Sequence, residues 1–155
     1  AERNLPVMVH ATDTSTIGDR DRQSDPEDVR AAVTDHPNAT IITAHLTAIG
    51  IRGVWEIQDL PHVVVDTSGM QPDAGLVEYA VRILGADRVV YGSDMFARDL
   101  TAQIGQVLGA DISLEDKQQL FFENAVRILR LSDEERAAVE NAHADWSPVE
   151  LRGKE

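Results

Sequence analysis

Side chains that can bind a metal ion or transfer a proton follow each of four short apolar runs in the first hundred residues. These positions are His10, His45, Asp66 with Thr67 and Ser68, and Ser93 with Asp94. Imidazole nitrogen and carboxylate oxygen are suitable ligands for zinc and other divalent ions, and both groups serve as general acids and bases. We therefore predict a metal-assisted site that contains His10, His45 and Asp94.

Each of these residues also has a simpler interpretation. A single histidine at the end of a strand is more often a structural hydrogen-bonding group than a ligand. Asp94 follows Gly-Ser and could cap the next helix, and Asp66, Thr67 and Ser68 could form a turn. The metal-site hypothesis depends on all of these side chains meeting at one rim.

The four apolar runs predict buried, parallel strands. They span residues 5–9, 39–44, 63–67 and 88–91 and do not alternate cleanly between apolar and polar residues. Such runs are typical of strands that helices cover on both faces. In folds of this class, chemistry takes place at the carboxyl ends of the strands, and these ends carry the candidate residues.

Helical patterns separate the runs. The first expected helix starts at a Ser24–Glu27 capping box and ends near Asp35. Further helices are expected over residues 52–58, 76–84 and about 99–108, and from a Ser113 cap to about residue 129. A last helix is expected to begin at Ser132. The order is therefore strand, helix, strand, helix, strand, helix, strand and then helices. This order predicts an α/β fold.

The composition of the chain excludes several classes of protein. Its 155 residues contain no cysteine and have a net charge of −13. Disulfide scaffolds, zinc fingers and cysteine nucleophiles are thereby excluded. The acidity argues against nucleic acid or an anionic membrane as the main partner. There is no long apolar span and no signal-peptide pattern, so we expect a cytoplasmic location.

The remaining histidines and the arginines near the rim receive weaker assignments. We expect His36 and His62 to lie at the opposite rim and His143 in a surface helix, all three without a chemical role. Residues 11–25 form a loop long enough to act as a lid. Arg20, Arg22, Arg52 and Arg98 could bind a substrate carboxylate or be solvated, and Trp55 and Phe96 could form pocket walls.

Five segments resemble a known family. LPVMVH, HPNATIITAHL, VVVDTSG, GADRVVYGSDMF and NAVRIL are similar to the second half of the metal-dependent amidohydrolase-related proteins. This branch includes aminocarboxymuconate-semialdehyde decarboxylase and the resorcylate decarboxylases. The resemblance implies a (β/α)8 TIM-type barrel of which this chain supplies strands five to eight, with residues 1–131 as the second half-barrel and 132–155 as a C-terminal helix and tail.

The resemblance also implies a role for each residue. His10 matches the fifth-strand metal ligand, and Asp94 matches the eighth-strand ligand that can also take a proton from bound water. His45 matches a sixth-strand histidine that acts as acid or base or binds a metal. Asp66 is expected to contact the substrate or support a ligand. Zinc is the expected metal, with manganese or iron as alternatives.

The implied function is metal-dependent hydrolysis of a small carboxylate-bearing or cyclic substrate. The alternatives are non-oxidative decarboxylation on the same scaffold and an inactive barrel fragment. A flavodoxin-like nucleotide-binding sheet is a further alternative, but no glycine-rich phosphate turn favours it. The family's first-strand His-x-His is missing, and Thr47-Ala48 stands where the family usually has two glycines after the sixth-strand His-Leu. We therefore expect a homo-oligomer or a complementing N-terminal half-barrel.

Overall fold

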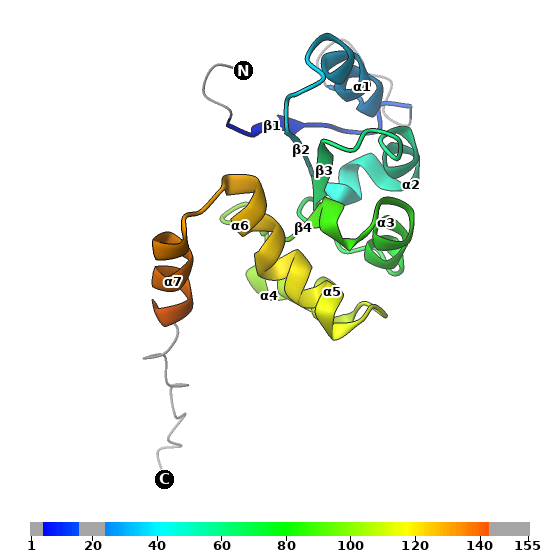
Figure 1. Ribbon diagram of the computed structural model, residues 1–155. Coiled ribbons are helices and arrows are strands. Elements are labelled where there is room, and N and C mark those ends of the chain that lie inside the picture. The colour runs from blue at the N-terminus through cyan, green and yellow to red at the C-terminus, as the bar shows by residue number, and fades with distance from the viewer. Residues whose placement is uncertain (1–4, 16–23, 143–155) are drawn as a thin grey trace.

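The computed structural model describes residues 5–15 and 24–142 and shows one parallel sheet (Figure 1). Its strands follow the chain in the order β1, β2, β3 and β4, so each strand pairs with the one before it. They span Val7–His10, Ile41–Ala44, Val63–Asp66 and Val89–Val90. The predicted α/β class and the four parallel strands are confirmed.

Helices follow each strand, as the sequence predicts. They are α1 (Pro26–Asp35), α2 (Leu46–Glu56), α3 (Leu76–Leu84), α4 (Leu100–Gly109), α5 (Leu114–Gln118), α6 (Asn124–Leu129) and α7 (Asp133–Ala142). A short 3-10 helix (Ala86–Arg88) precedes β4, and a π-helical turn (Gln119–Glu123) joins α5 to α6. Figure 1 shows α1, α2 and α3 on one side of the strands and α6 beyond β4, on the other side.

Two helix starts differ from the prediction. The N-cap of α1 is Asp25 rather than Ser24, because the Asp25 carboxylate accepts from the Glu27 backbone N–H and the Asp28 carboxylate accepts from the Asp25 N–H. Helix α2 begins at Leu46, six residues earlier than expected. Non-helical backbone at Gly50, with φ 58° and ψ −163°, divides it into two helical segments, and the sequence pattern predicts only the second of them.

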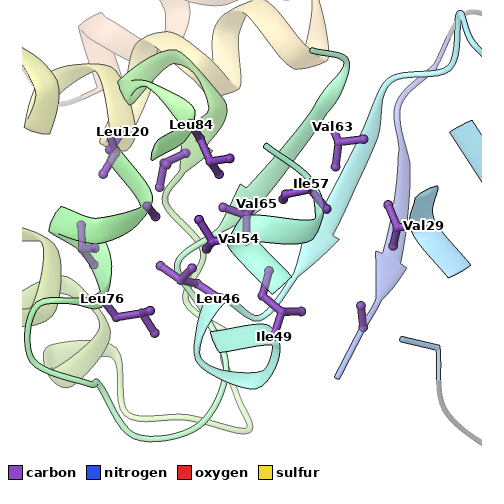
Figure 2. Packing of buried hydrophobic residues seen from close by; sticks show 14 of the residues in the cluster. Val29, Leu46, Ile49, Val54, Ile57, Val63, Val65, Leu76, Leu84 and Leu120 are labelled. Carbon is purple, nitrogen blue, oxygen red and sulfur yellow. The ribbon is translucent and has the colours of Figure 1, made fainter. Parts of the chain in front are cut away.

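One face of the sheet, which we call the outer face, carries most of the hydrophobic core. Strand residues such as Val63 and Val65 pack there against side chains of α1, α2 and α3, including Val29, Leu46 and Ile49 (Figure 2). All five of these side chains are buried. Burial of each contributes about 1.5–3 kcal/mol, so the outer face supplies most of the stability.

The opposite face, which we call the inner face, is sparsely covered. Ile42, Val64 and Val90 form a small separate cluster with Ile128 of α6. A cavity of about 190 Å³ remains beside it, and Met8 at the margin is 63% exposed. Since side chains alternate along a strand, His10 and Asp66 point to the same side as Met8 and Val64. His10 and Asp66 therefore lie on the inner face.

None of the helices in the described part of the chain combines the length and the apolar character needed to cross a bilayer.

Candidate functional site

The structure brings His10 and His45 together at the carboxyl ends of β1 and β2. His10 pairs in register with Ala44, and His45 follows directly. The ring centroids are 4.6 Å apart, with planes inclined by 74°. His10 is exposed and His45 is half-buried. Two imidazoles at this separation fit two ligand positions of one divalent ion, or a ligand beside a proton-transferring base.

His45 has an unusual backbone conformation that its neighbours hold in place. Its φ of 75° and ψ of 76° lie in the left-handed region, which is unfavourable by about 1–3 kcal/mol for a residue with a side chain. Its N–H donates to Asp66 Oδ1 at 3.1 Å, and its carbonyl accepts from the N–H of Ala48 at 2.8 Å. His45 is thus the N-cap residue of α2, yet its side chain makes no capping hydrogen bond to the helix.

Asp66 and Ser68 connect the end of β3 to the His45 ring. Asp66 is 5% exposed and Ser68 is 3% exposed. Asp66 Oδ1 accepts from the Ser68 N–H at 2.8 Å and lies 2.5 Å from Ser68 Oγ. Ser68 Oγ is in turn 2.8 Å from His45 Nδ1. Asp66 therefore reaches the His45 backbone directly and the His45 ring through Ser68.

Two glycines leave room for this arrangement. A Cβ on Gly69, where φ is 120°, would lie 2.4 Å from Thr47 Oγ1 and 2.9 Å from His45 Cβ. A Cβ on Gly92 would lie 2.9 Å from Asp66 Cγ. Distances below 3.0 Å force an atom to move, so a side chain at either position would displace a residue of the site. The contact of Ser68 with the His45 ring was not predicted, although its place in Asp-Thr-Ser-Gly at the end of a strand was the available signal.

Asp94 lies in the loop after β4 and does not complete a cluster with the two histidines. Its backbone is also left-handed, with φ 50°, and its Oδ2 is 3.4 Å from Nε of Arg98. The described residues contain no group of three or more His, Asp or Glu side chains positioned to hold a metal ion. Asp94 does not cap the next helix either, because Asp99 is the N-cap of α4.

Arg52 is engaged by acidic side chains, so it is neither the solvated arginine nor the free substrate-binding group that the sequence left as alternatives. It contacts Asp13 and Asp25 at 2.9 Å and Glu27 at 3.2 Å. Hydrogen bonds from Arg52, supported by Thr14, hold the pKa of the buried Asp25 carboxyl far below its usual range. Arg52 thus fastens the loop after β1 to α1 and α2.

The other predicted residues lie away from the two imidazoles or outside the described ranges. His36 is the C-cap of α1, and His62 directly precedes β3, so both lie at the opposite rim as expected. Trp55 and Phe96 are exposed. The predictions for Arg20, Arg22 and His143 fall on residues that the structure does not describe.

Comparisons with known proteins agree with this architecture. The sequence model of the family described as Amidohydrolase matches residues 1–131. A 5-carboxyvanillate decarboxylase from Sphingomonas paucimobilis is 14% identical over 84% of this chain and 51% of its own, with a TM-score of 0.63. An amidohydrolase from Burkholderia multivorans with bound zinc is 19% identical over 69% of this chain and 49% of its own, with a TM-score of 0.56.

A third solved structure is a dihydroxybenzoic acid decarboxylase from Polaromonas sp. JS666 with bound manganese and the inhibitor 2-nitroresorcinol. It is 16% identical over 66% of this chain and 37% of its own, with a TM-score of 0.53. At these identities the likeness shows the fold, which is part of a TIM-type barrel. The chain spans about half or less of the solved relatives it matches. No curated protein matches its sequence.

Proposed function

Since the chain belongs to the amidohydrolase family, we propose that it forms the carboxyl-terminal half of a metal-dependent hydrolase. Its substrate is a small carboxylate-bearing or cyclic organic molecule. The observation that supports this proposal is the pair of imidazoles, His10 and His45, with ring centroids 4.6 Å apart at the carboxyl ends of parallel strands. This is the end of an α/β sheet at which active sites are built.

Three residues carry the proposed chemistry. His10 and Asp94 are the metal ligands, and His45 is the general acid or base, with a second role as a ligand. Zinc is our first choice of metal and manganese the second. A bound divalent ion lowers the pKa of a coordinated water towards about 7. In this assignment Asp94 has to exchange its contact with Arg98, at 3.4 Å, for the ion.

Non-oxidative decarboxylation is the second candidate function. Two of the three solved relatives described above are decarboxylases, which favours this reaction somewhat. The same residues would serve it, because a divalent ion can also polarise a carbonyl or phenol oxygen and His45 can deliver a proton. Release of carbon dioxide from a hydroxybenzoate, as opposed to hydrolysis of an amide or ester, separates the two reactions.

Completion of the barrel is part of the proposal. A TIM-type barrel has eight strands, and the described sheet has four. The free edge of β1 exposes Leu5, Val7 and Met8, and an open row of strand N–H and C=O groups favours pairing with a further strand. We propose that a complementary half-barrel, or a second copy of the chain, adds strands there together with the missing metal ligands.

Metal titration of the purified chain tests the proposal. We expect weak but measurable zinc and manganese binding, which His10→Ala and Asp94→Ala each weaken at least about tenfold, or about 1.4 kcal/mol. His62→Ala is the matched control, because this exposed histidine lies at the opposite rim, and it should leave the affinity unchanged. Binding that His62→Ala weakens as much as His10→Ala would contradict the assignment.

A further inference from the structure

We infer that Ser68 and Asp66 fix the tautomer of His45, with the proton on Nδ1 and the lone pair on Nε2. Both are positioning residues, because they act on the reaction only through His45. The chemical use of the Nε2 lone pair rests on the proposed function. The tautomer itself follows from the hydrogen bonds alone.

The first step concerns the state of Asp66 Oδ1. This oxygen accepts two backbone N–H groups, from Ser68 at 2.8 Å and from His45 at 3.1 Å. A backbone amide can only donate, so Oδ1 acts as an acceptor and carries no proton. Since Ser68 Oγ lies 2.5 Å from this same oxygen, the proton between the two belongs to the hydroxyl. Ser68 therefore donates to Asp66, whatever the state of Oδ2.

The second step concerns the other contact of the hydroxyl. A serine hydroxyl has one proton and two lone pairs. Because Asp66 receives the only proton, Ser68 Oγ can act only as an acceptor in its 2.8 Å contact with His45 Nδ1. The imidazole must then donate from Nδ1. In a neutral ring, a proton on Nδ1 leaves Nε2 unprotonated.

Burial makes this arrangement a stable constraint. Asp66 is 5% exposed and Ser68 is 3% exposed, so water does not compete readily for their hydrogen bonds. Gly69 lies against the His45 Cβ, where a side chain would come within 2.9 Å, and the same loop holds the His45 backbone. The ring is thus held at Nδ1, and Nε2 is the nitrogen that remains to bind an ion or accept a proton.

Long-range ¹H–¹⁵N NMR of the ¹⁵N-labelled 155-residue chain tests the inference without metal or substrate. In mildly alkaline buffer, where an unperturbed histidine is neutral, we expect His45 to show a protonated Nδ1 and an unprotonated Nε2. His45→Gln assigns the signal among the five histidines. A wild-type His45 with its proton on Nε2 would overturn the inference, whether or not the variants fold.

Matched variants separate the effect of the hydrogen bonds from Asp66 through Ser68 to His45, which we call the relay, from the effect of general packing. Ser68→Ala removes the acceptor, and Asp66→Ala releases the hydroxyl proton to bond with Nδ1, so each should shift the tautomer toward Nε2–H. Asp66→Asn keeps an acceptor oxygen and should preserve the wild-type tautomer. Ser93→Ala, at the serine that follows β4, should also change nothing. If Ser68→Ala folds and keeps the wild-type tautomer, the relay is wrong.

This test and the metal titration can fail independently. If His45 carries its proton on Nε2, the inference fails, but a metal affinity that depends on His10 and Asp94 is not affected. Conversely, a chain that shows the expected tautomer but binds no ion contradicts the proposed function and leaves the relay standing.

Discussion

The outer and inner faces of the sheet are built from the same strands but serve different purposes. On the outer face, Val63 and Val65 lie under three helices in one continuous apolar cluster. On the inner face, Val64 belongs to a cluster of four buried residues beside a cavity, and Met8 is exposed. The outer face therefore determines whether the chain folds.

The same comparison explains where the chemistry lies. Alternation along a strand sends Asp66 to the same side as Val64, and His10 to the same side as Met8. Polar side chains on the outer face would have to be buried among α1, α2 and α3 at a large desolvation penalty. The inner face leaves the rim at the carboxyl ends of the strands accessible, so this sparsely packed side can hold the reactive groups.

The largest expected effect comes from truncating the outer core. Ile49→Ala should lower the free energy of unfolding by about 2–5 kcal/mol, because it removes a fully buried side chain and leaves a cavity. Ile49 is 0% exposed, whereas Ile51, on the same helix, is 63% exposed. Ile51→Ala should change stability by less than about 0.5 kcal/mol. Urea denaturation of the two variants provides the measurement, and equal losses would show that α2 does not bury the face described here.

A smaller effect is expected where the outer helices are fastened to the loop after β1. Arg52→Gln should lower stability by about 1.5–3 kcal/mol, the range for hydrogen bonds to charged groups, because it removes the partner of Asp13 and Asp25. The bond from Arg52 holds the pKa of Asp25 below its usual range in the folded state. This contribution is therefore complete above about pH 3.9, the unfolded value, and is lost as pH falls through the folded pKa.

Denaturation curves at several pH values test this sign. The stability gap between wild type and Arg52→Gln should be constant from about pH 7 to about pH 5 and narrow toward about pH 2. Arg30→Gln is the control, because Arg30 pairs with the exposed Asp59. The stability gap between wild type and Arg30→Gln should be smaller, and it should change less with pH, than the gap for Arg52→Gln. A gap that widens in acid would show that Asp25 is not the group responsible.

Sequence patterns predicted the fold more completely than the site. The apolar runs identified the four strands that the structure describes, and Gly85 and Ser113 marked a helix end and a helix start correctly. Of the predicted site residues, His10 and His45 do meet, because residues at the ends of neighbouring parallel strands lie side by side. Asp94 is placed by a loop rather than by strand register, and the apolar-run pattern gives no information about where such a loop turns.

Local hydrogen bonds account for the other differences. Arg52 was a candidate for substrate binding because it lies near the rim, but three acidic side chains distant in sequence engage it. Ser68 was one of the strand-end candidates, with a turn as the alternative, but its contact with the His45 ring was not predicted; it forms where that histidine has a left-handed backbone. Neither contact has a periodic signature, so pattern reasoning could not find them.

The smallest expected effect concerns the open inner face. Met8→Ser should change the stability of the 155-residue chain by no more than about 0.5 kcal/mol, because Met8 is 63% exposed. Val9→Ser, one residue along β1, should be clearly more harmful, since Val9 packs against the outer core. Urea denaturation of both variants measures the difference. A large loss from Met8→Ser would mean that the inner face is already covered in solution, as it would be in a closed assembly, and a concentration-dependent midpoint would then identify that assembly as an oligomer.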